Sequence, residues 1–260
     1  MNSKKSKASL NNYHPVSAVV LSLVIGFILP VIAAVFLGIT FSLLGTSGAD
    51  SAFEIWMQQN PVEVSFFSDE KIIIFPVENA VNYLLTVPLQ IWFIFWLLKR
   101  KKIDLSKNLG LYHFDRNALI YSLVAWLILY IVLTVYGYVF QITPPEEFIQ
   151  LMKATPFVLN FLMVVICAPI VEELLFRGFL FSQLRTTKLG IYGSIILTSL
   201  IWTSIHLQYD LLLLIPIFFL GLLLGYLMHK YNSLYLVIIV HAVHNLQATL
   251  FIEFFYDYFY

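Results

Sequence analysis

Long apolar stretches separated by short polar segments make up most of this chain. Seven of them run over residues 17–44, 77–98, 118–140, 157–184, 191–207, 211–229 and 233–253. A helix needs about 20 mostly apolar residues to cross the roughly 30 Å hydrocarbon layer of a bilayer. The pattern therefore predicts an all-α, polytopic transmembrane helical bundle with about seven spans.

Basic residues gather on one side of these predicted spans. Of the 15 Lys and Arg residues, all except Lys71 and Lys153 lie in the N-terminal tail, after the second span, around the inner end of the fourth span, or after the sixth span. The acidic residues outside the spans lie on the other side, apart from Asp104 and Asp115. Short cytoplasmic loops retain Lys and Arg. We therefore expect the N-terminus inside and the C-terminus outside.

The composition excludes several classes of protein. Of the 260 residues, 60% are hydrophobic and 12% are charged, whereas about 25% of residues are charged in an ordinary soluble domain. A soluble globular enzyme and a disordered chain are both excluded, and the lipid bilayer is the expected surrounding. The formal net charge of zero argues against a nucleic-acid partner. The single cysteine, Cys167, allows neither an intramolecular disulfide nor a Cys-based metal cluster.

Two adjacent carboxylates, Glu172 and Glu173, lie inside the predicted fourth span. A carboxylate at mid-bilayer costs about 2.5–3.5 kcal/mol on insertion scales, so two of them need a specific reason. Glu173 and Arg177 are spaced i, i+4 and can form an ion pair on one helix face. Glu172 points about 100° away from that face. We expect it to lack a partner and to suit the role of a general base.

Polar residues on two later spans complete a candidate site. His206 lies near the end of the predicted fifth span, and His241 and Asn245 share a face of the seventh at i, i+4 spacing. At about 1.5 Å of rise per residue, these three residues and Glu172 fall at similar depths from the cytoplasmic helix ends. We expect one site, reached from the cytoplasmic side.

The motifs of several hydrolases are absent from the sequence. It has no H-E-x-x-H, no G-x-S-x-G and no pair of aspartates within the spans. A glutamate with a histidine can activate water, and a histidine with an asparagine amide can donate to the oxyanion that forms during peptide hydrolysis. Alternatively, His206 and His241 together with a glutamate could hold a divalent metal such as Zn²⁺, which would activate the same water.

Three short motifs in this order resemble a known family. They are E-E-x-x-x-R at Glu172, Glu173 and Arg177, an aromatic-x-x-x-H at Trp202 and His206, and H-x-x-x-N at His241 and Asn245. The pattern resembles the CPBP family of intramembrane metalloproteases. This family includes the type II CAAX prenyl endopeptidases and the bacterial Abi, or bacteriocin-processing, proteases.

The resemblance implies a role for each matched residue. Glu172 would activate water together with His206, and His241 with Asn245 would stabilise the oxyanion. The family is commonly named a metalloprotease, although its need for metal is disputed. The resemblance therefore implies peptide-bond hydrolysis, with one divalent metal such as zinc as an optional cofactor.

The resemblance also suggests how the chain is organised. It covers residues 155–250, a protease-like core of spans four to seven in which Glu173 and Arg177 would support the site. Residues 1–154 hold spans one to three and an extracytoplasmic loop, and residues 251–260 form a short aromatic tail.

The expected function is an intramembrane endopeptidase in a cell membrane that acts on a membrane-associated peptide or protein. The composition, rich in Ile, Phe, Tyr, Lys and Asn, favours a bacterial plasma membrane. An alternative is a non-proteolytic membrane partner, such as a bacteriocin self-immunity or scaffold protein. A proton-coupled transporter is a weaker alternative, because the sequence shows no inverted repeat.

Overall fold

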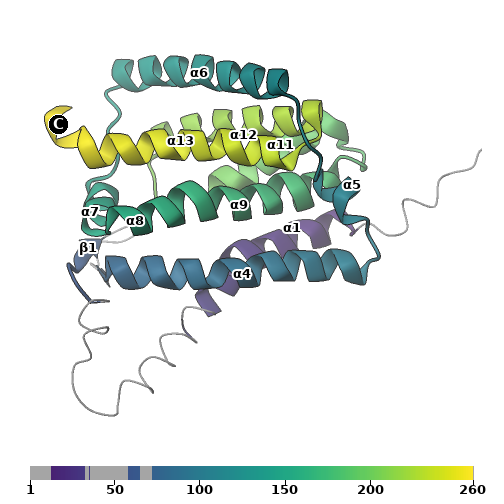
Figure 1. Ribbon diagram of the computed structural model, residues 1–260, viewed down its shortest axis with the longest axis horizontal. Helices are drawn as coiled ribbons and strands as arrows, with labels where there is room; N and C mark the ends of the chain where they lie inside the picture. Colours follow the sequence, from purple (N-terminus) through teal and green to yellow (C-terminus); the bar gives the residue numbers. More distant parts are fainter. Residues whose placement is uncertain (1–12, 33–34, 36–57, 65–71, 260) are drawn as a thin grey trace, which may run out of the picture.

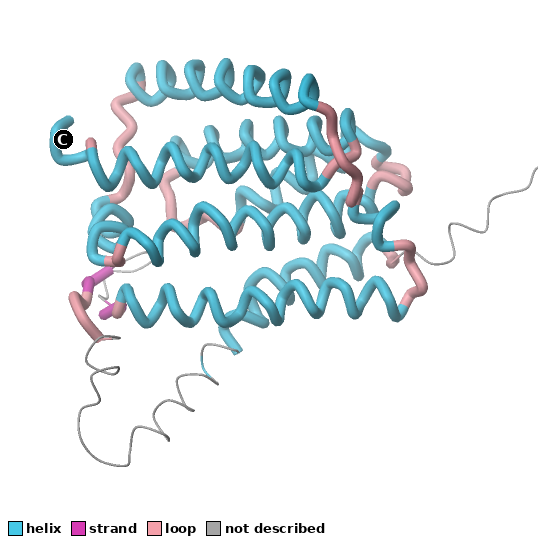
Figure 2. Tube along the Cα trace, viewed as in Figure 1, coloured by secondary structure: helices cyan, strands magenta, loops and turns pink. Residues whose placement is uncertain are grey.

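Helices make up nearly all of the structure (Figure 2), a computed structural model that describes residues 13–32, 35, 58–64 and 72–259. A two-stranded hairpin accompanies them in this part of the chain. The elements before the fourth predicted span are α1 (Pro15–Leu23), η2 (Val24–Ile28), β1 (Val62–Val64), β2 (Ile72–Ile74), α4 (Pro76–Arg100), α5 (Leu105–Leu109), α6 (Arg116–Val139) and α7 (Glu146–Ala154). The later ones are α8 (Phe157–Asn160), η3 (Phe161–Cys167), α9 (Ala168–Glu173), η4 (Leu174–Leu180), α10 (Phe181–Leu184), α11 (Gly190–Ser204), α12 (Leu211–Tyr231), α13 (Leu234–Phe254) and α14 (Tyr256–Phe259).

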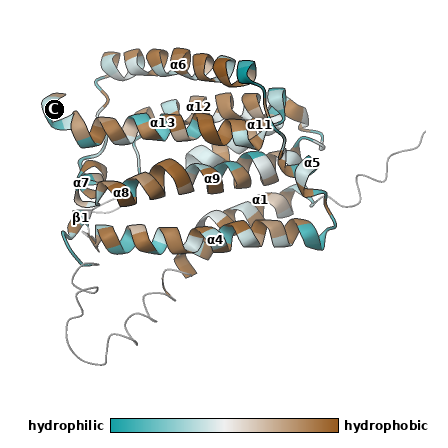
Figure 3. Ribbon diagram, in the orientation of Figure 1, coloured by the Kyte–Doolittle hydropathy of each residue, from teal (hydrophilic) through white to brown (hydrophobic). Residues whose placement is uncertain are grey.

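The predicted polytopic helical bundle is confirmed. Within the described residues, six helices are long and apolar enough to cross a membrane: Pro15–Ile32, Pro76–Arg100, Arg116–Val139, Phe157–Leu184, Leu211–Tyr231 and Leu234–Phe254. Figure 3 shows them mostly brown along their length, with teal patches near several helix ends. Most of the predicted first span beyond Ile32 lies outside the described residues.

The predicted fifth span is shorter than expected. Its helix, α11, has 15 residues and ends at Ser204, whereas the prediction extended to residue 207. The backbone turns immediately afterwards, where the N–H groups of Ile205 and His206 donate to the carbonyls of Trp202 and Thr203. His206 therefore lies in the turn that follows the helix. The number of spans remains a prediction.

The bundle separates the basic and acidic connecting segments. Figure 1 shows α5 at one end, and α7, β1 and the C-terminus at the other. At the α5 end, the Leu234 N–H donates to the Gly110 carbonyl, and the Ser182 hydroxyl donates to the Asn108 side chain. This separation agrees with the charge pattern along the chain, and the side of the membrane that each end faces remains a prediction.

The hairpin of β1 and β2 and the short helix α7, all at the acidic end, were not predicted. The strands β1 and β2 pair in antiparallel register, with Val62 opposite Ile74. The short helix α7 buries Ile149 and Met152 against Ile252 of α13. Strands of three residues and a helix of nine are too short to produce a clear periodic pattern in the sequence.

The fourth span, Phe157–Leu184, is the central helix of the bundle. It is one continuous helix in which π-helical turns, η3 and η4, flank the α-helical segment α9. Pro169 has no N–H to give to the preceding turn, and π-helical turns inside α-helices occur frequently at functional sites. The Glu172–Glu173 pair lies at the end of α9, immediately before η4.

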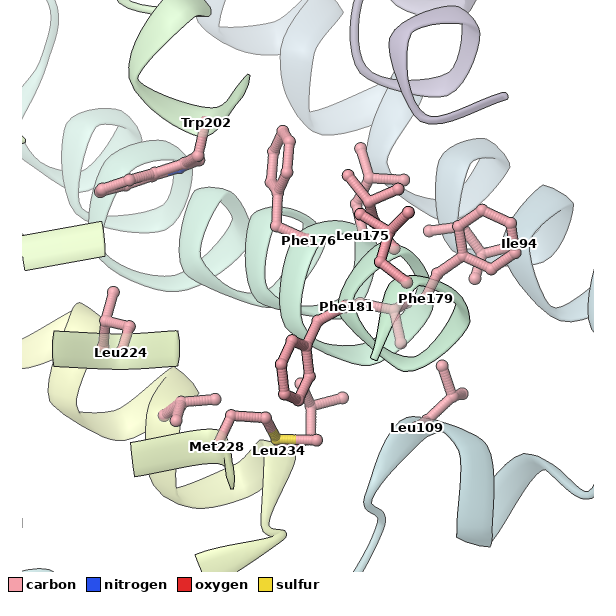
Figure 4. Close-up of a cluster of buried hydrophobic side chains, with 14 of the residues drawn as sticks. Ile94, Leu109, Leu175, Phe176, Phe179, Phe181, Trp202, Leu224, Met228 and Leu234 are labelled. Atoms are coloured by element: carbon pink, nitrogen blue, oxygen red, sulfur yellow. The ribbon is translucent and has the colours of Figure 1, made fainter. Parts of the chain in front are cut away.

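The second half of this helix forms the hydrophobic core. Every residue from 173 to 184 is buried. Figure 4 shows side chains of this helix surrounded by others from several elements. The labelled ones are Leu175, Phe176, Phe179 and Phe181 on the helix, and Ile94, Leu109, Trp202, Leu224, Met228 and Leu234 around it. The carboxylate and guanidinium of this helix are thus held within densely packed apolar side chains.

Small residues let α12 pack closely against α11. A Cβ atom added at Gly221 would lie 3.0 Å from the Ser199 Cβ and 3.1 Å from Cε3 of Trp202. At Gly225 it would lie 2.9 Å from Cγ2 of Ile195. Glycine at membrane helix interfaces permits this close backbone approach, which brings α12 against the helix that carries Trp202.

We predict that Gly221→Val destabilises the bundle, because its added methyl groups would push α12 away from Ser199 and Trp202. Overpacking of this kind costs about 1–3 kcal/mol. The midpoint of thermal unfolding in detergent micelles measures the effect. Gly137→Val is the matched control, since an added Cβ at Gly137 on α6 meets no atom within 4 Å. Equal midpoints for the two variants would contradict the proposed close contact.

Candidate active site

The Glu173 carboxylate joins two helices in the centre of the bundle. Its Oε1 atom accepts hydrogen bonds from Nη1 of Arg177 at 3.0 Å and from Nδ1 of His241 at 2.8 Å. Nη2 of Arg177 donates to the Gly221 carbonyl of α12 at 3.0 Å. Glu173 and Arg177 are fully buried, so the predicted i, i+4 ion pair is confirmed. The network connects the fourth span to α12 and α13.

Trp202 lies between this network and Glu172. The Cζ atom of Arg177 is 4.8 Å from the centre of the Trp202 ring, a cation–π distance. The indole Nε1 donates to Oε2 of Glu172 at 2.6 Å. The rings of His206 and His241 meet the Trp202 ring edge-on, with centroids 5.3 Å and 5.4 Å away.

The expectation that Glu172 lacks a partner is therefore wrong. Its hydrogen bond comes from α11, the neighbouring helix, and helical spacing within one segment cannot reveal such a contact. A phenylalanine at position 202 would keep the packing but could not donate this bond. The Glu172 side chain is 18% exposed, and its Oε2 lies 4.0 Å from Nε2 of His241. This distance is longer than a hydrogen bond.

His206 lies in the turn after α11, with Nδ1 3.0 Å from the Trp202 carbonyl oxygen. A carbonyl oxygen only accepts hydrogen bonds, so Nδ1 carries the hydrogen. In the neutral ring, Nε2 is then an acceptor. The Tyr209 ring stacks on His206 with centroids 6.2 Å apart. The turn thus presents a histidine whose free nitrogen can accept a proton.

Asn245 and His244 lie on α13 beyond His241. Nδ2 of Asn245 donates to the Val164 carbonyl at 2.8 Å, so one of its two amide hydrogens is already engaged. Nδ1 of His244 accepts a hydrogen bond from Nε1 of Trp126 on α6 at 3.3 Å. His244 falls outside the three motifs, and no role was predicted for it.

One cavity of about 530 Å³ adjoins these side chains. Its wall includes all four residues predicted to be catalytic: Glu172, His206, His241 and Asn245. Much of the remaining wall is apolar or aromatic, including Phe148, Met163, Ile217, Leu220, Phe251 and Ile252. Tyr83 of α4 also contributes, from outside the segment that carries the motifs. The four predicted residues therefore share one apolar pocket.

The cavity extends toward the acidic end of the bundle. Its wall includes Pro144 and Pro145 before α7, Met152 within α7, and Ile252 near the end of α13. The expectation that the site is reached from the cytoplasmic side stays a prediction, because the side of the membrane that each end faces is itself a prediction. At the acidic end, α7 packs on α13, and residues of both helices form part of the cavity wall.

The donor groups do not fit a metal site as they stand. In the part of the chain that the structure describes, no three His, Cys, Asp or Glu side chains are grouped so that they could hold a metal ion. The two candidate ligands, His206 and His241, each have Nδ1 engaged with an oxygen of the protein, which leaves Nε2 as the nitrogen that could bind a metal. We therefore assign no chemical step to a metal.

A comparison with protein families identifies the segment that contains the site. Residues 154–247 match the family described as Rce1-like, type II CAAX prenyl endopeptidase. This segment is similar to the Rce1-like family, and we refer to it as the Rce1-like segment. At the level of the family, the match supports an intramembrane endopeptidase of the CAAX type. Comparisons with curated proteins and with solved structures give no match.

The Rce1-like segment contains all the motif residues, but it does not form the whole cavity wall. Tyr83, Pro144 and Phe148 line the cavity from outside residues 154–247. Helix α7 ends at Ala154, where the matched segment begins. Residues that precede the Rce1-like segment therefore help to form the pocket that contains its motif residues.

We predict that Arg177→Met lowers the stability of the folded protein, because it leaves the Glu173 carboxylate buried without its cation. Breaking a buried pair in this way costs about 3–5 kcal/mol. Purification yield and the midpoint of thermal unfolding measure the effect. The double variant Glu173→Gln/Arg177→Met should recover much of the loss, because it removes both charges. Arg116→Met, at an exposed position, is the control. Wild-type stability of Arg177→Met would contradict the structural role of the pair.

Proposed function

We propose that this chain is an intramembrane endopeptidase in which Glu172 activates a water molecule for attack on a peptide carbonyl. The observation that supports this most strongly is the shared cavity. Glu172, His206, His241 and Asn245 come from three separate segments and line one pocket. Ionisable side chains within a membrane are costly and mark functional sites by default.

In the proposed reaction, Glu172 takes a proton from water, and the resulting hydroxide attacks the carbonyl carbon of the scissile bond. His206 accepts a hydrogen bond from the water at Nε2 and orients it. The tetrahedral intermediate then collapses, the C–N bond breaks, and the proton held by Glu172 passes to the leaving nitrogen. The carboxylate is restored, so the cycle is complete without a covalent intermediate.

The oxyanion is proposed to be stabilised by His241 and Asn245. Since Nδ1 of His241 donates to Glu173, Nε2 can donate to an oxyanion only when the ring is protonated. The Glu173 carboxylate then acts as the counter-ion of the imidazolium. Asn245 keeps one amide hydrogen beyond its bond to Val164. Donors of this kind act where charge develops in the transition state.

The proposed substrate is a membrane-associated peptide or protein. The cavity wall is largely apolar, so it suits an apolar segment or a lipid-modified peptide better than a soluble polar one. The family description names prenylated CAAX sequences, which are peptides of this chemical kind. The proposed location is a cell membrane, with a bacterial plasma membrane favoured by the composition.

We predict that Glu172→Gln abolishes cleavage, because the amide keeps the size of the side chain but cannot accept the proton of water. The rate should fall at least ~10²-fold. The assay uses three quenched fluorescent peptides in proteoliposomes: a prenylated CAAX peptide, its unprenylated counterpart, and an apolar membrane-segment peptide. Glu146→Gln, at an exposed position on α7, is the matched control and should retain activity.

Two outcomes of this assay count against the proposal. One is equal cleavage by the wild-type protein and Glu172→Gln, and the other is cleavage of none of the three peptides by the wild-type protein. A bacteriocin self-immunity or scaffold protein, the alternative function, would keep its cellular phenotype after Glu172→Gln.

His206→Ala and His241→Ala should both lower the cleavage rate, each by at least ~10²-fold. Their effects on stability should differ. His241 is buried and hydrogen-bonded to Glu173, so its loss should also lower the unfolding midpoint. His206 lies in a turn at the cavity, so His206→Ala should unfold near the wild-type midpoint. His113→Ala, at an exposed position, is the control. Full activity of either variant would remove that histidine from the proposed mechanism.

A further inference from the structure

His244 lies on the cavity wall but has no part in the mechanism described above. It is three residues beyond His241 on α13, and both residues line the cavity. The Nδ1 atom of His244 accepts a hydrogen bond from Nε1 of Trp126 on α6 at 3.3 Å. Trp126 lies outside the Rce1-like segment. A helix from the N-terminal region therefore sets the orientation of a ring at the cavity.

The bond from Trp126 determines which nitrogen of His244 carries the hydrogen. An indole N–H is a donor only, so Nδ1 of His244 must be an unprotonated acceptor. The neutral ring then carries its hydrogen on Nε2. Within the described residues no hydrogen bond to Nε2 is present, and Nε2 is not one of the unpaired polar atoms that are sealed from solvent. His244 thus offers a neutral N–H donor at the cavity.

The other two histidines of the cavity have the opposite arrangement. Nδ1 of His206 faces a carbonyl oxygen, and Nδ1 of His241 faces the Glu173 carboxylate. Both rings therefore carry a hydrogen on Nδ1, and in their neutral form they present an acceptor at Nε2. Of these three histidines, His244 is the one that can donate from Nε2 while neutral.

We propose that Nε2–H of His244 binds a carbonyl oxygen of the substrate backbone, and that Trp126 is its positioning residue. This inference rests on the proposed endopeptidase function and deepens it. A backbone carbonyl inside a transmembrane helix is already hydrogen-bonded within that helix. A donor of this kind therefore selects a substrate segment that is extended or unwound at the site, and it disfavours an intact helix.

Binding measurements test the proposal without requiring cleavage. In the Glu172→Gln background, the affinity of the three peptides named above, without their quenchers, is followed by fluorescence. His244→Leu should weaken binding of the tightest peptide about 3- to 10-fold, the range for one lost hydrogen bond. His244→Gln keeps an N–H donor and should restore most of the affinity. Val243→Leu, a neighbouring position outside the cavity wall, should bind as the parent does.

A spectroscopic measurement tests the role of Trp126. In protein labelled with ¹⁵N-histidine, the His244 signal, assigned by its loss in His244→Leu, should show the Nε2–H tautomer. Trp126→Phe keeps an aromatic ring but removes the donor, so the ¹⁵N chemical shift of Nδ1 in this signal should change as its hydrogen bond is lost, and binding should weaken. A control at Trp92, an exposed indole, should leave the signal unchanged when replaced by Phe.

The outcomes separate this inference from the proposed function. If His244→Leu binds the peptides as tightly as the parent, or if Trp126→Phe leaves the histidine signal unchanged, the inference is overturned while the endopeptidase assignment stands. Failure of all three peptides to bind the parent also overturns it. If the peptides bind with the predicted differences but the wild-type protein cleaves none of them, the endopeptidase proposal fails and His244 remains a peptide-binding residue.

Discussion

The Glu173 carboxylate accepts hydrogen bonds from Arg177 on its own helix and from His241 on α13, and Arg177 also holds the Gly221 carbonyl of α12. A carboxylate and a guanidinium are costly in a membrane unless each is paired and hydrogen-bonded. The central helix must therefore stay close to both α12 and α13. This requirement fixes the position of His241, and the close packing of α12 on α11 then brings Trp202 over the guanidinium.

The two adjacent glutamates consequently occupy different environments. Glu173 is sealed in the core, whereas Glu172 is 18% exposed at the cavity and accepts its hydrogen bond from the Trp202 indole. These environments fit a structural role for Glu173 and the proposed general-base role for Glu172. His241 lies between the two glutamates: its Nδ1 is hydrogen-bonded to Glu173 in the buried network, and its Nε2 lies on the side of Glu172.

Local features of the sequence predicted most of the fold. A backbone in hydrocarbon must satisfy its hydrogen bonds within a helix, so long apolar runs identified the spans, and the fourth matched the structure at residues 157 and 184. The Glu173–Arg177 pair was predictable because its partners are one turn apart. The end of α11 was not predictable, because apolar residues such as Ile205 and Leu207 continue the apolar run after the backbone has turned.

Contacts between helices account for what the sequence could not predict. The bond from Trp202 to Glu172 and the bond from Trp126 to His244 join residues 30 and 118 positions apart. Neither follows from a periodic pattern within one segment. The extent of the cavity toward the acidic end depends on α7, whose nine residues are too few to produce a clear periodic pattern in the sequence. The motif residues indicated the chemistry of the site, and the surrounding contacts could be seen only in three dimensions.

The central claim is that water activated by Glu172 attacks the substrate directly. A single turnover in H₂¹⁸O, with the protein in excess over a cleaved peptide, tests it by mass spectrometry of both the products and the protein. Direct attack places one ¹⁸O atom in the new carboxylate of the released fragment and none in the protein segment that contains Glu172. Incorporation of ¹⁸O into Glu172, or a product carboxylate that contains only ¹⁶O, would show that the glutamate attacks the peptide itself and would contradict the account.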